Sequence, residues 1–320
     1  MLYPWTKPGW DQLIKRHRDG RMPHALLISG LPGIGKLELT HSLVESLLCQ
    51  LPDQDGQACG QCKSCLLMAA GTHPDAFSVS LVDDKKQIGI NQIRELGTQL
   101  VLSSQLQGYR TAIIHPAAAM THAAANSLLK TLEEPGPDTI ILLVTSDPAR
   151  LPATVRSRCQ MVKLPVAEQN QAQQWLQEQG VEQPELALAL AQGAPLKAIE
   201  LSESNLFETR SALFDDFTDL VRGDLSPVKL AANWQKKNDQ TLLYLLDSWL
   251  SDMVRLKFEQ NPSNFSNMDY QQGLQGLAGL IQSRSLFGHL DRVRQALAWQ
   301  EFSLNRDLLI EDVLIPLAPV

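Results

Sequence analysis

A short loop near the N-terminus has most of the residues of a phosphate-binding motif. The segment GLPGIGK supplies Gly30, Gly33, Gly35 and Lys36. In the pattern G-x-x-x-x-G-K followed by Ser or Thr, backbone amides surround the phosphate oxygens and the lysine reaches the terminal phosphates. Here Leu37 stands in place of the hydroxyl residue, which would be a ligand of Mg²⁺. The loop therefore retains groups that contact phosphate and lacks one that holds the metal.

A second metal ligand is missing at the end of an apolar run. Residues 110–116 predict a strand that ends at His115 and Pro116. Neutral imidazole is a poor ligand for Mg²⁺, which prefers oxygen, and proline offers no base. Asp83 and Asp84 are other carboxylates, but their run is typical of a solvated turn. We expect no ATP hydrolysis by this chain and a packing role for His115 rather than general-base catalysis. Nucleotide binding is left open by these residues.

Four of the five cysteines lie within residues 49–65, at spacings that suit a metal. They are Cys49, Cys59, Cys62 and Cys65. In a reducing compartment this clustering favours a tetrahedral Zn²⁺ site over disulfides. Four thiolates leave no open position on the metal, so we expect a structural site rather than a catalytic one. His73 is the alternative ligand if Cys49 points away, and four free thiols are the alternative without metal.

Strands and helices alternate through the first half of the chain. Buried strands are predicted at residues 24–30, 76–82, 110–116 and 139–146, and helices at residues 36–50, 91–102 and 121–134. A strand, a glycine loop and a helix in this order form the context that the phosphate motif requires. The alternation predicts a doubly wound α/β domain.

The second half of the chain is predicted to be helical. Residues 166–203 indicate a small helical unit, broken by Gly and Pro at residues 193–195. Its expected core residues are Trp175, Leu176, Leu186, Leu188 and Leu190. From about residue 205 the chain again reads as helix, and an amphipathic stripe covers residues 241–258. A length of 320 residues is more than one hydrophobic core usually serves, which predicts two or three domains.

Composition limits the classes of function. A formal charge of −7 argues against a broad electrostatic grip on nucleic acid, so any DNA contact should be shared with partners. The N-terminus lacks the apolar segment of a secretion signal, and no run approaches the roughly 18 apolar residues of a membrane span. We expect a cytoplasmic protein with no membrane contact.

Several long motifs occur in the order found in one family. The segments PHALLISGLPGIGK (23–36), AAANSLLKTLEEP (123–135) and TSDPARLPATVRSRC (145–159), with the four-cysteine insert, resemble bacterial clamp-loader subunits of the AAA+ class. The resemblance extends to about residue 200, and NRDLLIEDVLI (305–315) is similar to the last helix of the family. Within that family the chain resembles the non-hydrolysing stator of the DNA polymerase III clamp loader.

Departures from the ATP-using relatives single out the stator. Those relatives, gamma and tau, would have Asp-Glu where His115 and Pro116 stand, and Ser or Thr in place of Leu37. They also carry a sensor arginine in the helical lid, where this chain has Leu196 beside Lys197. The intact Gly35-Lys36 pair is the one departure from a fully decayed site, so the resemblance also leaves binding of ATP in doubt.

The resemblance implies a three-domain organisation. An α/β AAA+ nucleotide-binding-like domain with the zinc module (49–65) would occupy residues 1–165, a helical lid residues 166–206, and an all-α collar residues 207–320. The collar would join a five-subunit ring with gamma or tau and with delta. That ring would load a sliding clamp onto primed DNA during replication.

The resemblance also assigns a role to Arg158 in the SRC motif. This arginine would reach across a subunit boundary and place its charge on the γ-phosphate of ATP held by an adjacent gamma or tau subunit. Arg156 is the alternative finger. Residue counting alone favours a local ion pair of Arg158 with Glu133 or Glu134, whereas the motif favours the finger.

Two other functions are consistent with parts of the sequence. One is an ATP-hydrolysing clamp-loader motor that uses Lys36, and Leu37, His115 and Pro116 argue against it. The other is a zinc-dependent nucleic-acid adapter that acts alone. The acidic chain, with few basic or aromatic residues around the cysteines, makes the adapter the weakest of the three.

Overall fold

The computed structural model describes residues 2–82, 85–106, 108–203, 206–234, 239–259, 265–299 and 306–319. Asp83 and Asp84, considered above as carboxylate sources, lie outside the described residues, as does Asn305 at the start of the expected last helix. The chain divides into two compact units, Met1–Ala172 and Gln173–Val320.

A parallel five-stranded sheet forms the centre of the first unit. Its strands are β1 (Ala25–Ser29), β2 (Ala76–Val79), β3 (Arg110–Ile114), β4 (Thr139–Thr145) and β5 (Gln160–Lys163). They lie in the order β2-β3-β4-β1-β5 and every pairing is parallel. The predicted parallel α/β fold is confirmed. The expected strand at residues 76–82 is shorter than predicted, and β5 is an additional edge strand.

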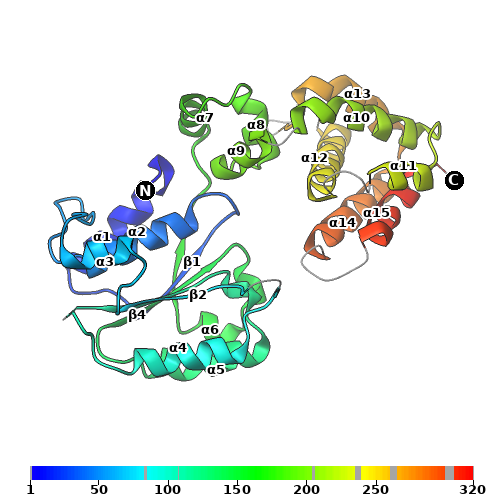
Figure 1. Cartoon of the computed structure of the whole chain (residues 1–320). Coiled ribbons are helices and arrows are strands. Elements are labelled where there is room, and N and C mark those ends of the chain that lie inside the picture. The colour runs from blue at the N-terminus through cyan, green and yellow to red at the C-terminus, as the bar shows by residue number, and fades with distance from the viewer. Residues whose placement is uncertain are drawn as a thin grey trace. The chain divides into compact units, whose positions relative to one another are not determined.

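Helices cover both faces of this sheet. On one side lie α1 (Lys7–Arg18), α2 (Lys36–Leu48) and α3 (Lys63–Ala69); on the other lie α4 (Ile90–Leu100), α5 (His122–Glu133) and α6 (Ala153–Arg156) (Figure 1). Single turns of 3-10 helix occur at η1 (Pro4–Thr6), η2 (Ala117–Ala119) and η3 (Pro148–Arg150). This is the doubly wound arrangement that strand–helix alternation predicts.

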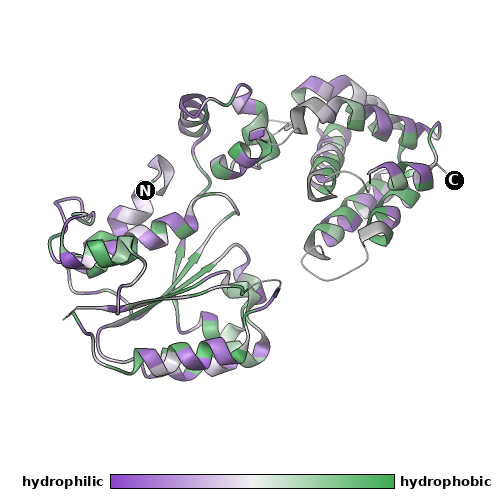
Figure 2. Ribbon diagram, in the orientation of Figure 1, coloured by the Kyte–Doolittle hydropathy of each residue, from purple (hydrophilic) through white to green (hydrophobic). Residues whose placement is uncertain are grey.

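The core of the unit follows from strands that are apolar on both faces. Every residue of β1, β3 and β4 is buried, and most residues of these strands are hydrophobic (Figure 2). Because successive side chains of a strand point to opposite faces, Ala25 and Leu27 reach the α4–α5 layer, where Leu128 and Leu132 are also buried. Burying each large aliphatic side chain stabilises the fold by about 1.5–3 kcal/mol.

All regular secondary structure in the described parts of the second unit is helical. Its helices are α8 (Pro184–Leu190), α9 (Pro195–Glu203), α10 (Leu206–Arg222), α11 (Pro227–Trp234), α12 (Asp239–Phe258), α13 (Gln271–Leu280), α14 (Ser283–Trp299) and α15 (Arg306–Leu314). Single turns of 3-10 helix occur at η4 (Met268–Tyr270) and η5 (Ile315–Leu317), and α7 (Gln169–Glu178) crosses the boundary between the units.

The expected stripe of α12 forms part of the core of the second unit. Leu242, Leu246, Trp249 and Met253 are buried, and Leu256 is partly buried. The Trp249 ring stacks on Phe217 of α10 with 5.3 Å between ring centroids. Of the expected core between residues 166 and 203, Leu176, Leu188 and Leu190 are buried, whereas Trp175 and Leu186 are partly exposed.

None of the helices in the described segments combines the length and the apolar character that crossing a membrane requires.

Candidate functional site

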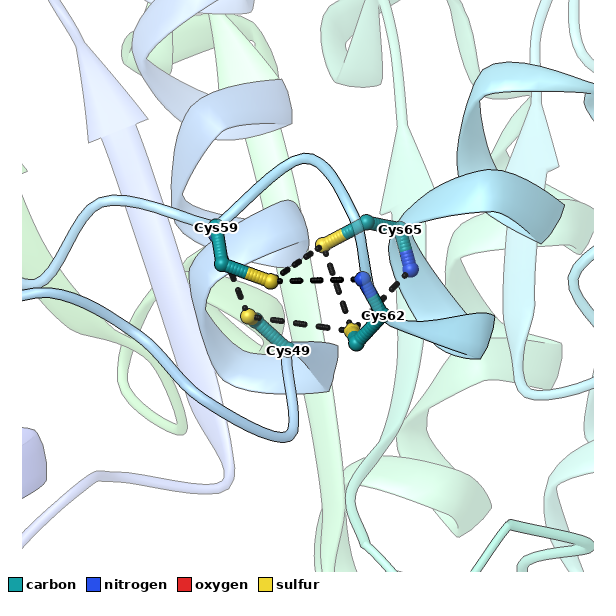
Figure 3. Close-up of side chains that lie close together, drawn as sticks. All are labelled: Cys49, Cys59, Cys62 and Cys65. Carbon is teal, nitrogen blue, oxygen red and sulfur yellow. Dashed lines mark hydrogen bonds between the residues drawn. The ribbon is translucent and has the colours of Figure 1, made fainter.

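The four clustered cysteines are brought together where α2 gives way to α3. Cys49 follows the last residue of α2, Cys59 lies in the connecting loop, Cys62 caps the N-terminus of α3, and Cys65 lies in its first turn. Their four sulfur atoms lie within 4.8 Å of one another and point inward (Figure 3). The prediction that these cysteines form one cluster is confirmed, and the cluster could bind a metal ion.

The sulfur positions fit a tetrahedral metal site. The Sγ–Sγ distances are 3.5 Å for Cys62–Cys65, 3.9 Å for Cys59–Cys65 and 4.0 Å for Cys49–Cys62. A Zn²⁺ ion with Zn–S bonds of about 2.3 Å has tetrahedral edges of about 3.8 Å between sulfurs. Four thiols at these separations therefore have the geometry of a closed site.

Backbone amides point at the sulfur atoms and stabilise negative charge on them. The amides of Leu51 and Cys59 donate to Cys49 Sγ at 3.4 and 3.3 Å, and the amide of Cys62 donates to Cys59 Sγ at 3.4 Å. Burial alone would raise the pKa of Cys62, but amide and thiol hydrogen bonds outweigh it and lower that pKa to about 6. Burial, together with hydrogen bonds to the neighbouring thiols, raises the pKa of Cys65 to about 12, and a bound cation would favour its thiolate form.

His73 is not part of the cysteine cluster. It forms hydrogen bonds that connect α3, which carries Cys65, to the segment before β2. Its Nε2 lies 2.8 Å from the hydroxyl of Ser64 in α3, and its Nδ1 accepts the amide of Asp75 at 3.1 Å. Since Nδ1 is an acceptor, the proton is on Nε2, which donates to Ser64. Asp75 in turn accepts from the amides of Gln105 and Leu106 at 3.0 Å, just before β2. His73 thus belongs to the support of the module.

The glycine loop lies between β1 and α2, where the phosphate motif requires it. Gly33 and Gly35 adopt positive φ angles of 74° and 83°, which glycine reaches without steric cost, and Gly35 is the N-cap of α2. The Lys36 side chain is only 6% exposed, and its Nζ donates to the carbonyl of Leu31 at 2.6 Å. Lys36 is therefore folded back onto its own loop.

Aromatic residues from the N-terminus pack against the outside of this loop. Trp5 donates its indole N–H to the carbonyl of Ile34 at 2.9 Å and stacks on Tyr3 with 5.1 Å between ring centroids. A Cβ at position 35 would lie 2.5 Å from the Tyr3 ring, so Gly35 is required by this packing as well as by its φ angle. The sequence motif explains Gly35 through phosphate alone. The early pair of aromatic residues was the only signal for this second contact.

His115 follows β3 at the same edge of the sheet as the glycine loop. The carboxyl ends of parallel strands share one edge, and Pro116 follows directly. Burial lowers the pKa of His115, and the nearby charge of Lys36 lowers it further, against an opposing effect of Glu38. The ring is therefore neutral near neutral pH and offers no negative charge to a metal ion.

Arg158 makes a local ion pair on the surface. Its Nη2 lies 2.5 Å from Oε1 of Glu133, and its Nη1 donates to the carbonyl of Thr154 at 3.0 Å. The side chains of Arg158 and Glu133 are 36% and 51% exposed. This pair is the local alternative that residue counting favours, and the Arg158 side chain stays partly exposed to solvent. Arg156, the alternative finger, is half-buried.

Comparisons with known proteins place the chain in one family. Residues 6–168 match the family described as "DNA polymerase III, delta subunit", and residues 204–318 match "DNA polymerase III, delta subunit, C terminal". The Escherichia coli K12 protein named DNA polymerase III subunit delta' is 36% identical, covering 98% of this chain and 94% of that protein. The chain belongs to the DNA polymerase III subunit delta' family.

Other delta' proteins match over the same length. The Pseudomonas aeruginosa protein is 33% identical over 98% of this chain and 96% of its own, and the Yersinia pestis protein is 36% identical over 98% and 94%. The resemblance drawn from residues 123–135 and 145–159 is therefore confirmed at the level of the family. The separate roles of Arg158, Gly30, Gly33, Gly35 and Lys36 in this delta' family member stay predictions.

Replacing Lys36 by Met is expected to raise the free energy of unfolding near neutral pH by about 1–3 kcal/mol. Burial lowers the pKa of Lys36 to about 8, so the folded chain bears a cost for the charged amine. Below about pH 8 the amine is protonated whether the chain is folded or unfolded, and the cost is present in full. As the pH rises from about 8 toward the unfolded value near 10.4, the cost disappears. Urea unfolding at several pH values measures the difference in free energy of unfolding between the Lys36→Met variant and the wild type. A difference that does not change with pH would contradict the prediction.

Proposed function

We propose that this chain is the non-hydrolysing stator of the DNA polymerase III clamp loader, acting in the bacterial cytoplasm. It would assemble with gamma or tau and with delta, and it would help load the sliding clamp onto primed DNA. The observation that carries this proposal is a phosphate loop with Leu37 and His115 in place of metal ligands, within a chain of the delta' family. Lys36, tied to the carbonyl of Leu31, supports the same proposal.

The proposal divides the chain into three functional parts. Residues 1–165 form the AAA+ domain, residues 166–206 the lid, and residues 207–320 the collar that joins the ring. The break between α8 and α9 at residues 193–195 supports a separate small helical part, and the long amphipathic α12 and α14 suit a helical assembly domain. The module of residues 49–65 is an insert that a structural Zn²⁺ holds through Cys49, Cys59, Cys62 and Cys65.

Loss of assembly tests the collar. A fragment that lacks residues 207–320 is expected to fold, because the first compact unit contains the whole sheet and ends at Ala172. It should fail to co-purify with gamma or tau and delta, because the proposed assembly helices are gone. Pull-down from the reconstituted complex measures this, with the full chain as control. Co-purification of the fragment at full strength would exclude the collar role.

A motor subunit is the second candidate, and the intact Lys36 is what favours it. Its test is steady-state ATP turnover by the purified chain, which we expect to be absent because Leu37 and His115 cannot hold Mg²⁺. The matched control is Lys36→Ala, which removes the amine that a motor subunit would use to contact phosphate. Turnover by the wild-type chain that this variant abolishes would establish the motor instead of the stator. Binding of a fluorescent ATP analogue, followed in parallel, measures occupancy of the loop separately.

The stator role would also give Arg158 a target outside its own chain. A guanidinium can stabilise charge on the γ-phosphate only where that phosphate is held with its metal, and this chain lacks the metal ligands. An accessible Arg158 would therefore act on ATP bound by a neighbouring subunit.

A further inference from the structure

Two contacts fix the guanidinium of Arg158 to its own chain. Oε1 of Glu133 lies 2.5 Å from Nη2 in an ion pair, and the carbonyl of Thr154 accepts a hydrogen bond from Nη1 at 3.0 Å. These contacts hold both terminal nitrogens, so they set the plane of the group as well as its position. The backbone amide of Arg158 also donates to the carbonyl of Val155 at 3.1 Å.

The residues that make these contacts are attached to the hydrophobic core. Glu133 is the last residue of α5 and follows Leu132; Thr154 lies in α6 and precedes Val155. Leu132 and Val155 are both buried in the same core cluster. The carboxylate and the carbonyl therefore have rigid supports from two different helices, although both lie at the surface.

The pairing leaves hydrogen-bond donors for an outside acceptor. Each terminal nitrogen of arginine carries two hydrogens, and Nε carries a fifth. Glu133 and Thr154 each use one, so both terminal nitrogens retain a hydrogen for phosphate oxygens. An arginine side chain has a large rotamer entropy. Because the ion pair already fixes its geometry, less of this entropy is lost when the guanidinium contacts the phosphate.

We propose that Glu133 is the positioning residue of Arg158, orienting its guanidinium for the phosphate of a neighbouring subunit. This inference rests on the proposed function, since it requires that Arg158 act in trans. The ion pair with Glu133 would then orient the guanidinium, and the oriented guanidinium would contact the phosphate. The two roles of Arg158 are therefore compatible. Glu133 itself touches no phosphate.

The test is clamp- and DNA-stimulated ATP turnover by rings reconstituted with variants of this chain. Glu133→Gln keeps the size of the side chain and removes its charge, and it should lower the Arg158-dependent part of kcat about two- to fivefold, the range that one exposed ion pair supports. The Arg158-dependent part is the kcat of wild-type rings minus the kcat of Arg158→Ala rings. KM for ATP should be unchanged, because the contact matters only in the transition state. Glu133→Asp should restore part of the loss.

The matched control is Glu134→Gln, the same change one residue along. Within the described residues, no ion pair involves Glu134, so this variant should turn over ATP like the wild type. The double variant Glu133→Gln with Arg158→Ala should match Arg158→Ala alone, since Glu133 acts through Arg158.

The outcomes separate the inference from the function on which it rests. If Arg158→Ala lowers turnover and Glu133→Gln leaves it unchanged or raises it, the positioning role is wrong and the trans role stands. A loss in Glu133→Gln that Glu134→Gln reproduces would also overturn the positioning role. If Arg158→Ala itself changes nothing at matched assembly, the trans role and the positioning role are both wrong.

Discussion

Replacing Cys65 by Ser is expected to reduce bound zinc from about one ion per chain to nearly none. Cys65 is buried in the first turn of α3, and its sulfur lies close to those of Cys59 and Cys62. A serine hydroxyl cannot replace the thiolate, and a structural zinc supplies folding free energy of about 10–16 kcal/mol in small zinc modules. Metal analysis of protein purified without chelator measures the loss, with limited proteolysis to locate the loosened segment.

The fifth cysteine provides the matched control. Cys159 lies outside the cluster, and burial raises the pKa of its thiol to about 11. Cys159→Ser makes the same chemical change and should leave the zinc content intact. Wild-type protein without zinc, or a Cys65→Ser variant that retains a full ion, would contradict the metal assignment.

Damage from the lost metal should stay close to the module. Its loop is tied to α1 by the indole N–H of Trp10, which donates to the carbonyl of Asp55 at 3.0 Å. The bond between His73 and Ser64 connects α3 to the segment before β2. The sheet is buried independently of these contacts, so we expect cleavage within residues 49–65 before the strands are lost.

Local signals explain which parts of the fold the sequence predicts. The runs that became β1, β3 and β4 are mostly apolar and are buried on both faces, as is typical of strands covered by helices on both sides. Strand β5 has only one buried residue, Val162, and is too short for a periodic pattern to emerge. The cysteine cluster is predictable because its spacing is short and its ligand type is specific.

Contacts between distant residues explain what the sequence does not predict. The packing of Tyr3 on Gly35 joins the N-terminus to a loop some thirty residues later, and no periodicity encodes it. The hydrogen bond between His73 and Ser64 likewise depends on where the loop that contains Cys59 places α3. The pair of Arg158 with Glu133 could be proposed from charge, but choosing it over Glu134 required the orientation at the end of α5.

Replacing Arg158 by Ala is expected to lower the clamp- and DNA-stimulated ATPase of the reconstituted ring while leaving folding, zinc content and assembly intact. The transition state of phosphoryl transfer spreads charge over the γ-phosphate oxygens, and a guanidinium placed there raises the rate by on the order of 10³-fold or more. In the proposed ring the loss should be partial, because the other interfaces would retain their own arginines. Folding should be unaffected, since Arg158 is exposed and an exposed ion pair contributes only about 0–1 kcal/mol.

Two further variants define the chemistry of this effect. Arg158→Lys should restore little turnover, because a point charge on a flexible stem does not reproduce the planar fork that Glu133 and Thr154 hold. Arg156→Ala, two residues away and half-buried, is the control for loss of positive charge in this segment. A larger loss in Arg156→Ala than in Arg158→Ala would move the finger to Arg156. Unchanged turnover in Arg158→Ala rings at matched assembly would leave Arg158 with its local ion pair alone, because a residue that contacts the transferring phosphate cannot be removed without cost to the rate.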